Sequence, residues 1–148
     1  MQKITFIFIF TIICSTCLYA ANTHKTDSLE NLLKTINKKQ KAKLLNELAK
    51  AYFPNYPKKS MEYAKSALLL AKKQNNRIEQ AFSLKYIGIA FYYQSKYKEA
   101  LEHYNNSLHI FKELDNKPEI SKLFNNIGII YYELNNYEDA VEYYQKAL

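Results

Sequence analysis

The sequence is poor in the residues that make tight turns: of 148 residues, only two are glycine and three are proline. A sheet of many strands needs many turns, and glycine and proline supply most of them. We therefore expect few connections joining long elements, and we predict that these elements are helices. Tryptophan is absent, whereas 14 tyrosines and 8 phenylalanines offer large surfaces for packing.

The first 20 residues have the order of a secretory signal peptide. Lys3 precedes an uncharged apolar run over 4–13, and a more polar segment ends at Ala20. This order predicts export from a bacterium into the periplasm or cell envelope, with cleavage after Ala20. An uncleaved membrane anchor is the alternative, because no lysine, arginine or acidic residue occurs over 4–23.

Cysteine occurs only in this leader, at Cys14 and Cys17. Removal of the leader would leave a chain without thiols, which excludes disulfides, thiolate catalysis and cysteine-based metal sites. The net charge of +7 is uneven, since residues 25–73 carry 12 basic and 4 acidic side chains and residues 77–148 carry 8 and 10. A basic front half suits an anionic partner or an envelope surface, whereas solvated lysine-rich helix faces are the plainer alternative.

Two stretches of the sequence, 81–108 and 121–148, align without a gap at a distance of forty residues. The identical pairs are Ile87/Ile127, Gly88/Gly128, Ile89/Ile129, Tyr92/Tyr132, Tyr97/Tyr137, Ala100/Ala140, Glu102/Glu142, Tyr104/Tyr144 and Leu108/Leu148. Apolar residues recur at spacings of three and four in both halves of each stretch, with a short polar connection between the halves. Each stretch is therefore predicted to form an antiparallel helix pair.

The glycines Gly88 and Gly128 fall inside predicted helices, where each costs about 1 kcal/mol relative to alanine. We expect each glycine to permit a close approach of the partner helix at Ala100 or Ala140.

This pattern resembles the tetratricopeptide repeat family, whose units place an apolar-glycine pair, aromatic residues and an alanine at fixed offsets. The matching residues are Leu84, Ile87, Gly88, Phe91, Ala100 and Tyr104, and again Phe124, Ile127, Gly128, Tyr131, Ala140 and Tyr144. The period differs, being forty residues here and 34 in the family. A weaker copy upstream places Leu44, Leu48, Ala51, Ser60, Ala64, Ala67 and Leu68 at the expected offsets.

We therefore divide the chain into a signal peptide at 1–20, a linker with a short N-terminal capping helix at 21–40, and repeats from 41 to the end. The repeats span 41–76, which is divergent, 77–116, and 117–148, which is incomplete. The resemblance implies an all-α, right-handed solenoid of antiparallel helix pairs.

The third unit ends inside its predicted second helix, whereas a solenoid normally finishes with a helix whose outer face is polar. The apolar residues that two helices cannot all cover are Ile129, Ile130, Val141, Tyr143 and Tyr144. We infer a fragment of a longer protein. Self-association through the open C-terminal end is the rival interpretation.

No pattern of catalytic or metal-binding residues stands out. His103 and His109 are six residues apart and do not share a helix face. The carboxylates of Glu138, Asp139 and Glu142 cluster at a predicted helix start, where the helix dipole stabilises negative charge. We therefore expect no enzyme activity, no cofactor and no metal, and nucleic acid is not an expected partner of an exported chain.

In the family that the sequence resembles, the first helices of successive units line a concave groove for a peptide or protein segment. Carried over by position, the groove residues are Phe82, Lys85, Ile89, Tyr92, Tyr93, Lys122, Asn125, Ile129 and Tyr132. One subgroup clamps C-terminal carboxylates, and Lys85, Lys122 and Asn126 fit that clamp in part. Ile89 stands where the clamp has asparagine, so carboxylate recognition is not expected. Inter-repeat core is the alternative role of Ile89 and Ile129.

The sequence thus predicts a non-catalytic, exported scaffold that binds a protein or peptide segment. The alternative is the extracytoplasmic sensory input module of a sensor kinase or transcriptional regulator. Such a receptor would continue past the repeats into a membrane span of about 20 apolar residues.

The intact mass of the native protein recovered from the cell envelope separates these two readings. A free-standing scaffold predicts a mass of 17.5 kDa less the leader. A much larger mass would contradict that reading and favour the input module.

Overall fold

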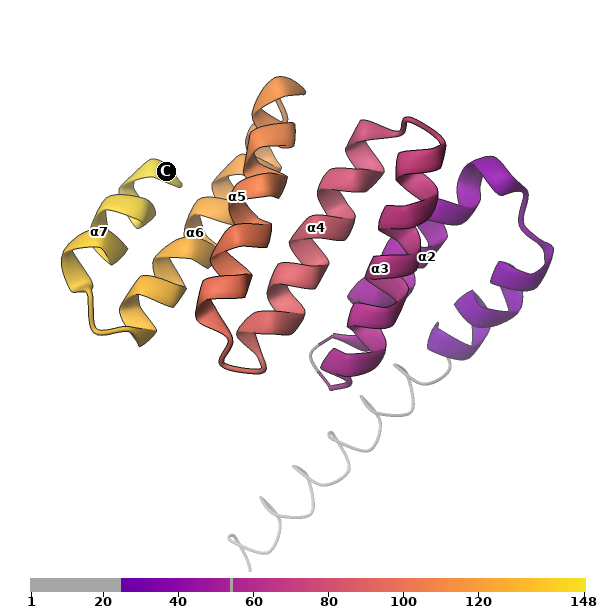
Figure 1. The fold of residues 1–148 in the computed structure, drawn as a ribbon, viewed down its shortest axis with the longest axis horizontal. Helices are drawn as coiled ribbons and strands as arrows, with labels where there is room; N and C mark the ends of the chain where they lie inside the picture. The colour runs from indigo at the N-terminus through magenta and orange to yellow at the C-terminus, as the bar shows by residue number, and fades with distance from the viewer. Residues whose placement is uncertain (1–24, 54) are drawn as a thin grey trace, which may run out of the picture.

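The computed structural model describes residues 25–53 and 55–148, and they form helices joined by short turns (Figure 1). The helices are α2 (Lys38–Tyr52), α3 (Pro57–Lys73), α4 (Arg77–Tyr92), α5 (Tyr97–Glu113), α6 (Lys117–Glu133) and α7 (Tyr137–Lys146). Residues 25–35 are also helical, and the described residues contain no strand. The predicted all-α class is confirmed, whereas the predicted signal peptide lies outside the described residues.

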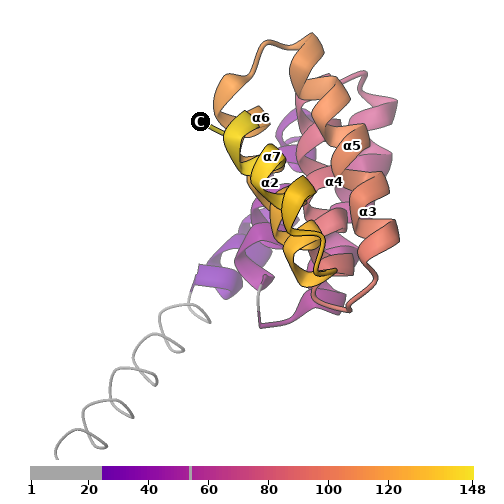
Figure 2. The ribbon, with the colours of Figure 1, turned by 90° about the vertical axis from the view of Figure 1, so that its left-hand side faces the viewer.

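Each helix packs against the next one in the sequence, and α2 also packs against α4. The helices stand side by side and form an elongated stack (Figures 1 and 2). Residues of α2, α4 and α6 line one common hollow. The first helix of each pair therefore belongs to an inner layer, as expected for a solenoid of helix pairs.

The four turns from α3 to α7 each contain one non-glycine residue with positive φ, and these residues lie 20 positions apart, at Asn75, Ser95, Asp115 and Asn135. Asparagine and aspartate tolerate this left-handed conformation better than most side chains. The next residue donates its N–H to a carbonyl five positions back, as Asn76 does at 2.9 Å. This Schellman arrangement satisfies the last helical carbonyls and reverses the chain without glycine.

Three of these turns also cap the following helix. Asn76, Asn116 and Asn136 each accept a hydrogen bond at 3.3 Å from the backbone N–H three residues later. Such caps satisfy an amide at the start of a helix that has no partner within the helix. The low glycine content is therefore compatible with many helix ends, because asparagine, aspartate or serine takes the left-handed position and asparagine caps three of the following helices.

Both glycines lie where another helix comes close. A Cβ atom at Gly88 would lie 2.6 Å from Cδ1 of Tyr104 and 3.2 Å from the carbonyl oxygen of Ala100. At Gly128, the corresponding atom would lie 2.7 Å from the ring of Tyr144. The tyrosine ring thus lies directly on the glycine in both helix pairs.

The apolar core is continuous from α2 to α7. One cluster of buried residues joins α4, α5 and α6, and a second joins α2, α3 and α4. Phe82, Ile89 and Phe91 of α4 pack against both clusters. Core packing therefore passes from the first helix pair to the second through α4, and from the second to the third where α5 packs against α6.

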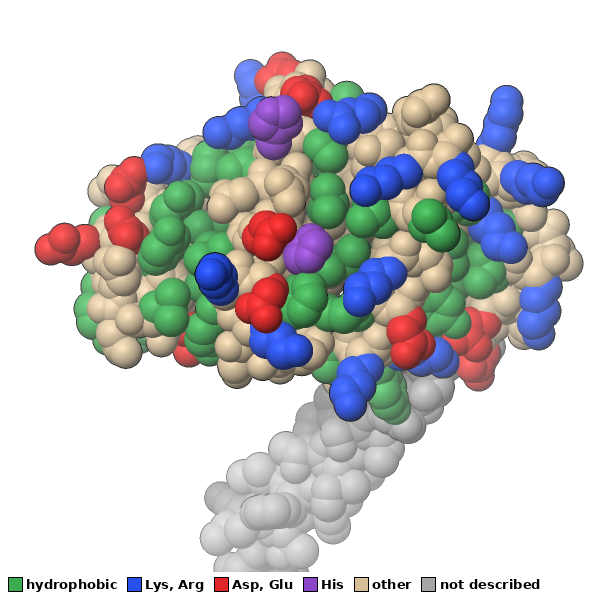
Figure 3. Space-filling model, viewed as in Figure 1, with side chains coloured by type: hydrophobic (Ala, Val, Ile, Leu, Met, Phe, Trp, Pro, Cys, Tyr) green, Lys and Arg blue, Asp and Glu red, His purple; other side chains and the backbone are tan. Residues whose placement is uncertain are grey.

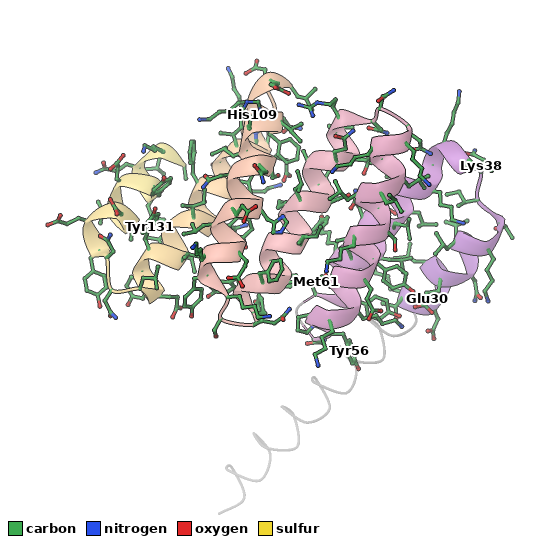
Figure 4. All side chains as sticks on the ribbon, viewed as in Figure 1. Glu30, Lys38, Tyr56, Met61, His109 and Tyr131 are labelled. Carbon is green, nitrogen blue, oxygen red and sulfur yellow. The ribbon has the colours of Figure 1, made fainter. Side chains whose placement is uncertain are left out.

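The N-terminal helical segment is held by a polar cluster around Glu30 (Figure 4). The Glu30 carboxylate accepts hydrogen bonds from the hydroxyls of Tyr52 and Tyr63, and it lies 2.9 Å from Nζ of Lys59. The hydrogen bond from Tyr52 is the main cause that lowers the pKa of Glu30 to about 2. Residues 25–35 are therefore joined to both helices of the first pair.

The C-terminal face is partly covered. Ile130 is fully buried, whereas Ile129 is 38% and Val141 54% exposed. Neighbouring residues of a helix point about 100° apart, which is why adjacent isoleucines have such different surroundings. The ring of Tyr143 stacks on that of Tyr131, with centroids 5.2 Å apart.

Over residues 25–53 and 55–148, every helix is either too short or too polar to cross a bilayer.

Replacing Gly88 with leucine should lower the free energy of unfolding by about 1–3 kcal/mol, because Tyr104 is buried and cannot turn aside. Gly128→Leu is the matched control, since Tyr144 is only half-buried and its ring can move into solvent. Urea unfolding followed by circular dichroism measures both. Equal losses in the two variants would contradict the role assigned to the buried ring.

Candidate functional site

A groove of about 750 Å³ crosses the inner layer of helices. We call it the inner groove, and its lining residues are Lys43, Asn46, Glu47, Lys50, Phe53, Glu79, Phe82, Lys85, Tyr86, Ile89, Glu119, Lys122 and Asn126. They come from α2 with its C-terminal cap, from α4 and from α6. Phe53, Phe82 and Ile89 supply apolar surface, whereas most of the other residues are polar or charged.

A buried polar cluster fixes α2 against α4 at one side of the inner groove. The Asn46 amide donates to the backbone carbonyl of Glu79 at 3.0 Å and to its carboxylate at 2.8 Å. The Ser83 hydroxyl lies 2.9 Å from the Asn46 carbonyl oxygen. These bonds satisfy a side chain that is only 3% exposed, and leaving it unpaired would cost free energy.

An ion-pair bridge joins α4 and α6 across the groove. The two Glu119 carboxylate oxygens lie 2.5 Å from Nζ of Lys85 and 2.7 Å from Nζ of Lys122. The side chains of Lys85 and Glu119 are 9% and 10% exposed, whereas that of Lys122 is 63% exposed. The buried ammonium therefore already has a counter-charge within the protein.

The pKa values of this bridge follow from burial and pairing. Burial lowers the pKa of Lys85, and the hydrogen bond to Glu119 opposes that effect. Burial alone would raise the pKa of Glu119, but hydrogen bonds from Lys122 and Lys85 outweigh it and leave the pKa below its usual value. Glu119 is thus ionised at neutral pH and neutralises Lys85.

The remaining cations of the groove are on α2. Lys43 and Lys50 are exposed, and neither forms an ion pair among the described residues. Nζ of Lys85 also lies over the rings of Phe82 and Tyr86, 4.8 and 5.0 Å from their centroids. The groove thus combines apolar surface from Phe82 and Ile89, a paired charge cluster at α6, and two lysines of α2 that flank Glu47.

The structure brings together some of the nine residues predicted from the sequence. Phe82, Lys85, Ile89 and Lys122 line the inner groove, and Tyr93 packs edge-on against Phe53 at 4.9 Å.

The other predicted residues do not line this hollow. Tyr92 packs against the rings of Tyr93 and Tyr97, and Tyr132 packs against Tyr137. Asn125 and Ile129 are exposed on α6. These four lie outside the lining because the groove is formed by α2 and α4 together with one side of α6.

Sequence reasoning missed the contribution of α2, as well as Glu79, Tyr86 and Glu119. The available signal was the recurrence of glutamate forty residues apart, at Glu79 and Glu119, two positions after each helix begins. Among the described residues, no group of histidine, cysteine, aspartate and glutamate could hold a metal ion.

Replacing Glu119 with glutamine should destabilise the fold by about 3–5 kcal/mol, because Lys85 would keep a buried charge without a counter-charge. The double variant Lys85→Met with Glu119→Gln should recover most of the loss. Glu113→Gln, which breaks the exposed pair with Arg77, is the control and should change little. Urea unfolding measures the stability of all three variants. A Glu119→Gln protein as stable as the wild type would contradict the assigned pairing.

The comparisons with known proteins agree with this geometry. A family model described as "Tetratricopeptide repeat" matches residues 77–148. The tetratricopeptide repeat domain of Arabidopsis FLU is 27% identical, with a TM-score of 0.68, over 75% of this chain and 94% of that domain. A comparison with curated protein sequences gives no match.

Two further solved structures share the fold. BtubC from P. vanneervenii is 18% identical, with a TM-score of 0.70, over 83% of this chain and 54% of BtubC. A signal transduction ATPase with numerous domains from Pyrococcus horikoshii, which has a tetratricopeptide repeat sensor, is 24% identical, with a TM-score of 0.71. That match covers 81% of this chain and 19% of the ATPase. Residues 77–148 are therefore similar to the tetratricopeptide repeat family, both in sequence and in helix-pair geometry.

Proposed function

We propose that this protein is a non-catalytic scaffold that binds a protein or peptide segment in the inner groove. The observation that carries the proposal is the groove itself, because three helices from successive pairs contribute to one hollow whose lining includes apolar residues. Repeat arrays use such extended inner surfaces for binding. The similarity of residues 77–148 to the tetratricopeptide repeat family supports the same role.

Apolar contacts would supply most of the affinity. Phe53, Phe82 and Ile89 are each partly exposed and lie in the groove lining, so a ligand side chain can cover them. Tyr86 and Asn126 add a hydroxyl and an amide to the same lining. This mixture suits an extended or helical segment with one or two apolar anchors.

The groove is poorly suited to a free C-terminal carboxylate near α6. Lys85 and Lys122, the residues that fit a carboxylate clamp in part, already bind the Glu119 carboxylate. A ligand carboxylate at that place would compete with the Glu119 carboxylate. Binding the ligand costs translational freedom, whereas Glu119 is already held by the fold. We therefore infer that a ligand segment lying at the α6 side of the groove is an internal segment of its partner.

Two further proposals concern where the protein acts and what the scaffold serves. The leader supports export to the periplasm or cell envelope. A sensory input module is the second candidate, because the Pyrococcus horikoshii ATPase of the same fold has a tetratricopeptide repeat sensor.

Panning a displayed library of random peptides of about twelve residues on the full chain tests the binding function. Peptides that bind should lose about fivefold to tenfold in affinity for Ile89→Ala, because the truncation removes apolar surface from the groove. Ile129→Ala is the matched control, since Ile129 occupies the same position one helix pair later and lies outside the lining. Fluorescence anisotropy measures both.

Enrichment of no peptide would count against the scaffold function. Equal losses in the two isoleucine variants would place the binding site elsewhere on the solenoid.

A further inference from the structure

Lysines gather over α2 and α3, at one end of the molecule, whereas the opposite end is more acidic (Figure 3). We define the basic ridge as the exposed lysines Lys38, Lys39, Lys58, Lys65, Lys72 and Lys73. Among the described residues, none of these lysines forms an ion pair. The ridge is distinct from the inner groove, because no residue of α3 lines that groove.

The ridge is continuous from one helix to the next. Lys58, Lys65 and Lys72 recur every seven residues, which is close to two helical turns and places them on one face of α3. The Gln74 side chain donates a hydrogen bond of 2.5 Å to the backbone carbonyl of Lys38. The start of α2 therefore adjoins the end of α3, and Figure 4 shows Lys38 at this outer end.

An apolar side chain interrupts the ridge. Leu69 lies between Lys65 and Lys72 on the same face of α3 and is 60% exposed. A single exposed leucine is common on protein surfaces, so the weight of Leu69 comes from its place among the lysines. One acidic residue, Glu62, shares the face.

The other helix pairs show that the fold does not need positive charge here. The corresponding residues of α5, forty positions later, are Lys98, Glu102, Asn105, His109, Lys112 and Glu113. The corresponding residues at the start of α7 are Glu138 and Glu142. The same surface position is thus basic on α3, mixed on α5 and acidic on α7, so the charge of the ridge is a property of the first pair alone.

We propose that the basic ridge docks the protein on an anionic phospholipid bilayer. Lysine ammonium groups pair with lipid phosphates while their stems lie along the interface, and each lysine near an anionic surface strengthens binding. Leu69 would enter the interfacial region, a contact that the phosphates of a nucleic acid cannot offer. Because the ridge leaves the inner groove free, the bound protein would still be able to bind a partner.

Sedimentation of the full chain with vesicles tests this proposal. One set contains phosphatidylcholine alone, and the other contains about one quarter phosphatidylglycerol. We expect stronger binding to the anionic set, with the difference lost at high salt. The ratio between the two sets removes the contribution of the apolar run over 4–13, which every variant shares.

The triple variant Lys58→Gln, Lys65→Gln and Lys72→Gln should weaken binding to the anionic vesicles on the order of a hundredfold, at about fivefold for each lysine. The matched control removes the same charge through Lys98→Gln, Lys112→Gln and Lys117→Gln, two of which are the α5 counterparts of ridge residues. The control should lose at most about fivefold, because those lysines lie off the ridge. Circular dichroism verifies that both variants are folded.

Leu69→Ser should weaken binding about fivefold without changing the charge. Equal binding to both vesicle sets, or equal losses in the two triple variants, would overturn the proposal. Binding to a short DNA duplex that depends on the ridge, with no preference for anionic vesicles, would also overturn it and point to nucleic acid instead.

Discussion

The whole structure depends on how the chain reverses at the end of each helix. Between α3 and α7, one residue in the left-handed conformation occurs every 20 positions, and two backbone hydrogen bonds close each turn. This constant spacing sets the length of each helix, and it brings the same faces together in successive pairs. The close contact of Gly88 with Tyr104 therefore recurs at Gly128 with Tyr144. The alignment of α4 and α6 along one groove follows from the same regularity.

The second determinant is the distribution of charge among residues that the fold has already placed. The Glu119 carboxylate is paired within the protein with Lys85 and Lys122, so it offsets one of the two positive charges on the side of the groove near α6. On α2, Lys43 and Lys50 flank Glu47, and among the described residues neither lysine forms an ion pair. The two sides of the groove therefore differ in how their charges are paired, and this difference comes from the side chains.

The helix pairs could be predicted from the sequence because their signals are local. Apolar spacing of three and four residues, the glycine and the facing alanine all lie within one stretch of about forty residues. The groove could be predicted only in part, because its contacts join residues far apart in the sequence, such as Asn46 with Glu79 and Lys85 with Glu119. The groove side of α2 carries Lys43, Glu47 and Lys50. In the sequence alone, this pattern of charged residues looks the same as that of a solvated helix face. Only the lateral packing of the helices reveals which polar residues face the hollow.

The packing of each helix mainly on its sequence neighbours has a consequence for cooperativity. In such an array the free energy of folding is close to a sum of nearest-neighbour terms, so one end can open while the other stays folded. The inner groove spans several of these neighbouring units, since its lining comes from the alternate helices α2, α4 and α6. A segment bound along it would touch the first, second and third pairs at once. The ligand would then act as the long-range contact that the solenoid itself has in short supply, and it would make separate units open as one.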